Sequence, residues 1–149
     1  MLRARLVGLT LAFMSCASGP GVQAGGATLS CPPRTTLTVE GTVQGPATWL
    51  ACRADAGRPD GPSRMTYADG RVRNVGSYRA GEADGPWRFY DQEGVVTAEG
   101  AWIAGQREGR WLTFDGNGSR VEEYRAGKQV GHFVRRHSNG AVAEDGEYA

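Results

Sequence analysis

Aromatic and charged residues alternate along short stretches in the second half of the chain. Trp87 and Phe89 alternate with Arg88 and Tyr90, and this period of two is typical of a β-strand with one face carrying the larger rings. A Gly-containing segment follows, and then a second strand-like stretch over residues 95–103. The pattern therefore predicts β-hairpins. Since an isolated hairpin is only marginally stable in water, we expect neighbouring hairpins to pair edge to edge.

The hairpin pattern recurs with fixed internal spacing. In each copy an aromatic residue is followed by Gly, by a second Gly and by another aromatic residue, always at the same offsets. The copies are Tyr78, Gly81, Gly85 and Trp87; then Trp102, Gly105, Gly109 and Trp111; then Tyr124, Gly127, Gly131 and Phe133. Tyr148 continues the column of first aromatic residues. Such self-similarity predicts a repeat array.

The repeat length sets the size of each unit. The glycines that begin the units are 24, 24 and 22 residues apart: Gly61, Gly85, Gly109 and Gly131. Two strands and a turn fit this length, so four units predict about eight strands over residues 61–149. The fold class that we expect is all-β, an elongated antiparallel array of β-hairpins.

Four dipeptides lie between the two strands of the units, and each ends in Gly. They are Asp69-Gly70, Glu93-Gly94, Asn117-Gly118 and Asn139-Gly140. Because Asn, Asp and Gly adopt positive φ more readily than other residues, we expect two-residue hairpin turns at these places.

The aromatic columns have two interpretations. The rings of Tyr78, Trp102, Tyr124 and Tyr148 either pack against one another and the next hairpin, or form an exposed row that binds a sugar or a peptide. The two roles are compatible, because a sheet one layer thick cannot bury both of its faces.

The N-terminus has the features of an export signal. Residues 6–14 are predominantly apolar and follow Arg3 and Arg5; as a helix they reach about 14 Å, too short to cross a membrane but suited to a signal peptide. Cleavage after Ala24 would make residues 1–24 the signal peptide. Alternatively, residues 1–15 are removed and Cys16 is lipidated. We therefore predict an exported protein that is periplasmic, secreted or an outer-membrane lipoprotein.

Two further cysteines, Cys31 and Cys52, remain after either cleavage. In an oxidising compartment an even pair predicts a disulfide, which would staple an N-terminal segment over residues 25–60. This segment includes a degenerate first unit from Trp49 to Gly61. Metal binding is the alternative, but two cysteines without a nearby His make a poor set of ligands.

Charge and motif content exclude several classes of function. The 149 residues contain 17 Lys and Arg against 16 Asp and Glu, so we expect no nucleic-acid binding, and membrane contact only through a lipid anchor. The two histidines, His132 and His137, are not part of a nucleophile motif or a metalloprotease motif. The segment 115–118 lacks the further acids of a calcium loop. We expect a protein that is not an enzyme and has no cofactor.

The repeated residues resemble the MORN repeat, most closely its bacterial variant in YwqK-type, antitoxin-like proteins. The third copy departs from the pattern, because Glu122 replaces the leading Gly. The residues that carry the resemblance are Gly76, Tyr78, Gly81 and Gly85, then Gly100, Trp102, Gly105 and Gly109, then Tyr124, Gly127 and Gly131. The resemblance implies hairpin arrays that serve as scaffolds, dimerisation surfaces or lipid-proximal modules.

From these features we expect a non-catalytic envelope or secreted protein that binds or scaffolds a partner protein, itself a monomer or a weak dimer. The alternative is an antitoxin-like or immunity-like protein that neutralises a partner toxin. Export disfavours this alternative, since a typical antitoxin acts in the cytoplasm.

Overall fold

The computed structural model describes residues 29–40, 47–55 and 57–148. Within these residues all regular structure is β, with eleven antiparallel strands in one sheet and no helix, so the predicted all-β fold is confirmed. In chain order the strands are β1 (Thr36–Glu40), β2 (Ala47–Arg53), β3 (Pro59–Tyr67), β4 (Val72–Arg79), β5 (Glu82–Ala83), β6 (Gly85–Tyr90), β7 (Val96–Ile103), β8 (Gln106–Phe114), β9 (Gly118–Arg125), β10 (Lys128–His137) and β11 (Val142–Tyr148).

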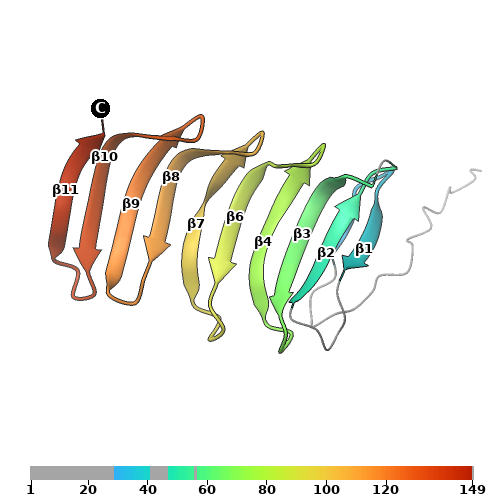
Figure 1. Ribbon diagram of the computed structural model, residues 1–149, viewed down its shortest axis with the longest axis horizontal. Coiled ribbons are helices and arrows are strands. Elements are labelled where there is room, and N and C mark those ends of the chain that lie inside the picture. Colours follow the sequence, from blue (N-terminus) through green and yellow to red (C-terminus); the bar gives the residue numbers. More distant parts are fainter. Residues whose placement is uncertain (1–28, 41–46, 56, 149) are drawn as a thin grey trace, which may run out of the picture.

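Each long strand pairs with its neighbour in the sequence, and the two-residue strand β5 pairs only with β4. Figure 1 shows the result as a single elongated row of hairpins, without a second layer over the described strands. The strands from β3 onward number eight besides β5, which confirms the expected count. The predicted boundary at residue 61 lies inside β3, and β1 and β2 extend the same sheet.

Two-residue turns connect the strands along the upper edge in Figure 1. They are Ala80-Gly81, Ala104-Gly105 and Ala126-Gly127, and both residues of each have positive φ. The three alanines have φ of 51°, 48° and 48°. Two consecutive positive-φ residues define the type I′ turn, whose twist matches that of the flanking strands.

The turns at the opposite edge are three residues long in three of the four predicted places. At the first of them, the Tyr67 N–H donates to the Arg71 carbonyl (2.8 Å) and the Gly70 N–H donates to the Tyr67 carbonyl (3.0 Å). The loops that end at Gly94 and Gly140 have the same pair of hydrogen bonds. The expected two-residue turns are therefore wrong here. A three-residue loop needs only one positive-φ residue, its Gly, and so places no such demand on the Asp, Glu or Asn before it.

The fourth of these turns has two residues, as predicted, but the residue with positive φ is not the predicted one. The Asp115 N–H donates to the Gly118 carbonyl (3.3 Å), so Gly116 and Asn117 form the turn. The positive φ, 77°, belongs to Gly116 and not to Gly118. A Gly at the first central position is typical of a type II′ turn.

A bulge recurs where the second aromatic residue of each motif lies. The single residue Gly100 of β7 faces the three residues Gly109–Trp111 of β8. In the same way, Glu122 of β9 faces Gly131–Phe133 of β10. The first Gly of each triplet has a positive φ, 66° and 62° respectively, which absorbs the extra residues. The repeated glycines are therefore required by backbone geometry.

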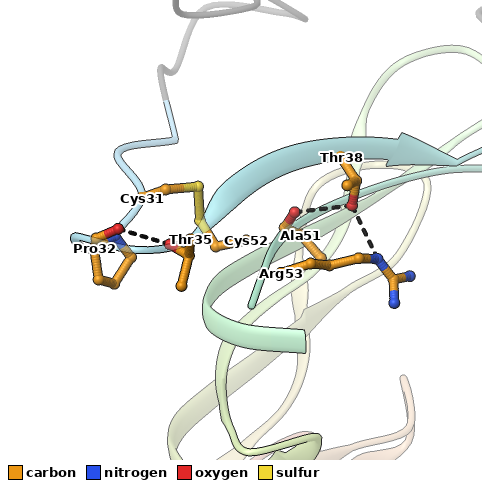
Figure 2. The surroundings of a disulfide bond; sticks show 7 residues. All are labelled: Cys31, Pro32, Thr35, Thr38, Ala51, Cys52 and Arg53. Atoms are coloured by element: carbon orange, nitrogen blue, oxygen red, sulfur yellow. Dashed lines mark hydrogen bonds between the residues drawn. A yellow bond between two sulfur atoms is a disulfide. The ribbon is translucent and has the colours of Figure 1, made fainter. Parts of the chain in front are cut away.

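Cys31 and Cys52 form a disulfide with a Cα–Cα distance of 5.5 Å, as predicted. The bond attaches the chain before β1 to β2, as Figure 2 shows. On the same strand pair, the Thr38 hydroxyl donates to the Ala51 carbonyl (3.1 Å) and accepts from Arg53 Nε (3.0 Å). Within the N-terminal segment, β1 and the chain before it are thus tied to β2 covalently and by side-chain hydrogen bonds.

Candidate functional site

One face of the sheet, which we call the ring face, carries the aromatic residues of the repeats. A continuous series of ring contacts crosses it from β2 to β9, with centroid distances between 5.2 and 6.4 Å. Edge-to-face and offset pairs are favoured in this range. The rings in order are Trp49, Tyr78, Trp87, Phe89, Trp111 and Tyr124, with Trp102 against Trp111 at 5.5 Å. Phe133 and Tyr148 form a separate pair at 4.9 Å.

The second aromatic residue of the first two motifs is a buried tryptophan. Trp87 is 8% exposed and Trp111 is 2% exposed. The ring of Trp87 covers Gly76, where a Cβ atom would lie 2.1 Å from it. Its indole N–H donates to the Ser77 carbonyl (3.2 Å), and that of Trp111 donates to the Ala101 carbonyl (3.0 Å). These two rings are structural supports of the ring face.

The first aromatic residues of the motifs lie opposite the glycines that begin the units. Gly61 pairs with Tyr78, Gly85 with Trp102, Gly109 with Tyr124 and Gly131 with Tyr148. Tyr124 is buried, whereas the other three are half-buried. Burial raises the pKa of the Tyr78 hydroxyl above its ordinary value, against an opposing effect of the Arg53 charge. These rings therefore pack, and three of them keep part of their surface exposed, while the binding of a sugar or a peptide by them stays a prediction.

Glu122, which replaces the leading Gly of the third copy, is the centre of a polar network on the ring face. Its carboxylate is 10% exposed and accepts hydrogen bonds from Arg120 Nε (2.8 Å) and Gln129 Nε2 (2.7 Å). The hydroxyls of Tyr148 (3.0 Å) and Tyr124 (3.3 Å) also donate to it. Burial would raise the pKa of Glu122, but these hydrogen bonds and the Arg120 charge outweigh it, so the pKa lies below the usual 4.5.

Arg107 lies among three rings of the ring face. Its guanidinium carbon is 4.4 Å from the Trp111 centroid, 5.2 Å from that of Tyr124 and 5.8 Å from that of Trp102. Its Nη1 also donates to the Tyr124 hydroxyl at 3.1 Å. A cation held over several electron-rich ring faces is a favourable electrostatic arrangement.

The back face of the sheet carries the residues that alternate with the rings. A groove of about 700 Å³ crosses its middle strands. Apolar side chains that include Val75, Pro86 and Leu112 line it, together with the Arg88–Glu99 ion pair, whose atoms are 2.9 Å apart. This size is within the range of small-molecule and peptide sites.

One of the two histidines singled out in the sequence contacts a carboxylate at the surface of the sheet. His132 Nε2 lies 2.6 Å from Asp145 Oδ1 in an exposed pair. Over residues 29–40, 47–55 and 57–148, no three His, Cys, Asp or Glu side chains are placed to hold a metal ion. The described part of the chain also contains no helix that is long and apolar enough to cross a membrane. Cys16 and the predicted cleavage sites lie outside the described residues.

Sequence reasoning missed the three polar residues that complete the ring face, namely Arg107, Arg120 and Gln129. The available signal was Glu122, since a carboxylate in a glycine position on an aromatic face requires partners. Phe89 and Trp49 were also left out of the candidate set, although both join the ring series.

No family model matches the chain, and no curated protein matches it.

Proposed function

We propose that the protein is an exported, non-catalytic repeat protein of MORN-like architecture that binds or scaffolds a partner protein. The observation that carries this proposal is the single-layer sheet with half-buried aromatic rings on one face. Aromatic side chains are enriched where proteins bind each other, because they offer a large contact area at a small entropic cost. The disulfide is compatible with an oxidising compartment.

Affinity capture tests the proposal. Immobilised mature protein is exposed to an envelope extract, and retained proteins are quantified by mass spectrometry. The control bait is the Gly100→Val variant, in which the larger side chain conflicts with the Trp111 ring and the sheet is expected not to form. A partner retained near one-to-one by the folded chain alone supports the proposal, and no difference between the baits contradicts it.

The identity of the captured protein also tests the antitoxin-like alternative. If the partner arrests growth when expressed alone and the chain relieves the arrest, neutralisation replaces scaffolding as the function. The intact mass of the exported protein separates cleavage after residue 24 from lipidation at Cys16, and retention of the precursor in the cell would contradict export.

A further inference from the structure

One position on the ring face recurs in all three motifs and is occupied differently in each. It is the residue paired with the first aromatic residue across the upper turn. Tyr78 pairs with Ala83, Trp102 with Arg107 and Tyr124 with Gln129. The aromatic surroundings of these positions are therefore directly comparable.

In the second motif this position supplies the cation described above, Arg107. The guanidinium lies over three rings: the first aromatic residue of its own motif, the second, and the first of the next motif. In the third motif a different residue, Arg120, lies 5.0 Å from the Phe133 centroid and donates to the Tyr148 hydroxyl at 2.8 Å. Both later motifs thus place a guanidinium of the chain itself against their rings.

The first motif has equivalent rings but only a methyl group in this position, that of Ala83. Tyr78 and Trp87 are 5.2 Å apart at 89°, which nearly reproduces the 5.5 Å and 88° of Trp102 and Trp111. Trp102 completes the set, because it pairs with Gly85 as Tyr124 pairs with Gly109. Among the described residues, no Arg or Lys lies over the ring of Tyr78 or Trp87.

Arg53, whose charge acts to lower the pKa of Tyr78, has other direct partners. Arg53 lies over Trp49 at 4.7 Å, pairs with Glu40 and donates to the Gly57 carbonyl. Ala83, Tyr78 and Trp102 are half-buried and can be reached from solvent, whereas Trp87 is only 8% exposed. Glu82 and Asp84 flank Ala83 in the sequence, and Asp84 is paired with Arg79 at 3.2 Å.

We propose that Tyr78, Trp87 and Trp102 form a binding site for an arginine side chain of a partner protein. The guanidinium is the cation that this chain itself places against the rings of the other two motifs, in the second motif from the equivalent position and in the third from Arg120. It is planar and weakly hydrated, which suits stacking on aromatic faces better than the compact ammonium of lysine. The identity of the partner as a protein rests on the proposed function, whereas the cation selectivity of the site does not.

The cation selectivity is tested by titration with a small probe. Nα-acetyl-arginine amide is added to the ¹⁵N-labelled mature protein, and the indole N–H signals of its four tryptophans are followed by NMR. We expect saturable shifts at Trp87 and Trp102. Nα-acetyl-citrulline amide, the neutral analogue of nearly the same shape, is expected to bind at least tenfold more weakly. Equal shifts from the two probes would overturn the proposal, as would tighter binding of tetramethylammonium than of the arginine probe.

Two variants provide matched controls. Ala83→Arg supplies the missing guanidinium from the chain itself, so the probe shifts at Trp87 should disappear. Arg107→Ala vacates the second position, so a new shift should appear at Trp111. If Ala83→Arg does not fold, as judged by circular dichroism, Arg107→Ala and the citrulline comparison still decide. Undiminished shifts in folded Ala83→Arg protein would contradict the site.

A capture experiment separates this inference from the proposed function. If the wild-type chain retains a partner and Ala83→Arg retains it at least tenfold less, both hold. If both baits retain the partner equally, the arginine site is wrong and the binding function stands. If the wild-type chain retains nothing, the proposed function fails, and the probe titration alone decides whether the site takes a guanidinium.

Discussion

The indole ring of Trp111 lies on the backbone of Gly100, so closely that a Cβ atom at Gly100 would be 2.3 Å from the ring. Because Trp111 is 2% exposed, its ring has no space into which it can retreat. A side chain at residue 100 would therefore displace the Trp111 ring and disturb the packing between β7 and β8. The same relationship holds between Trp87 and Gly76.

The first prediction follows from this contact. Gly100→Ala should lower the free energy of unfolding by about 3 kcal/mol, the upper range for overpacking a rigid site. Gly146→Ala is the comparison, because its Cβ would lie 2.8 Å from Phe133, a half-buried ring near the last strand that has room to move. Urea unfolding measures both variants. An equal loss in the two would show that ring burial does not control the cost.

The second prediction concerns the strained alanine of an upper turn. Ala104 has a φ of 48° and is exposed, so Ala104→Gly removes backbone strain without loss of packing. We expect a gain of about 0.5–1 kcal/mol in the free energy of unfolding. The same substitution at Ala101, in the strand β7, should instead cost about 0.5–1 kcal/mol. Thermal unfolding compares the two, and a loss at position 104 would contradict the turn assignment.

The third prediction is the pH dependence that Glu122 imparts. Its pKa is lower in the folded protein than in the unfolded chain, so its stabilisation is complete above the unfolded value near 4.5 and is lost as the pH falls through the folded value. Glu122→Gln should therefore be less stable than wild type at pH 7, by about 1–3 kcal/mol. This difference should shrink toward pH 3. Urea unfolding from pH 7 to pH 3 measures it, and a difference that grows on acidification would have the wrong sign.

The fourth prediction concerns the disulfide, which should stabilise the N-terminal strands more than the repeats. Replacing both Cys31 and Cys52 by Ser opens a loop closed over 21 residues and should cost about 3 kcal/mol of stability. Hydrogen exchange should accelerate in β1 and β2, while β8 to β10 retain their protection, because the backbone of each long strand is hydrogen-bonded only to neighbouring strands and the ring contacts of Trp49 reach no further than β4. Uniform acceleration along the sheet would instead indicate one cooperative unit.

The periodic part of this fold was predictable because it depends on local spacing. The offset from Tyr78 to Gly81 and Gly85 specifies a tight turn and a bulge, and Trp87 then falls on the ring face. The loop before Gly70 was not predictable in the same way. A short Asp-Gly loop can be closed by two residues or by three, and only the hydrogen bonds of Tyr67 distinguish them.

The partners of Glu122 in the polar network could not be predicted from spacing along the sequence, for a different reason. Glu122 meets Arg120 on its own strand, but it meets Gln129 and Tyr148 on two other strands. These distances depend on the bulge that begins at Gly131, which changes the register of β10 against β9. The departure at Glu122 indicated that something differed in the third copy, while its partners became visible only in three dimensions.

The glycines that begin the first three units, Gly61, Gly85 and Gly109, are 24 residues apart, and every long strand is hydrogen-bonded to its neighbours in the sequence. An in-frame deletion or duplication of one 24-residue block would therefore join equivalent positions of two units. The path of the chain through the rest of the sheet would not change. Evolution can shorten or lengthen this molecule in increments of two strands, roughly 10 Å each. The length of the sheet is thus an inheritable dimension, adjustable independently of the surface that any single block presents.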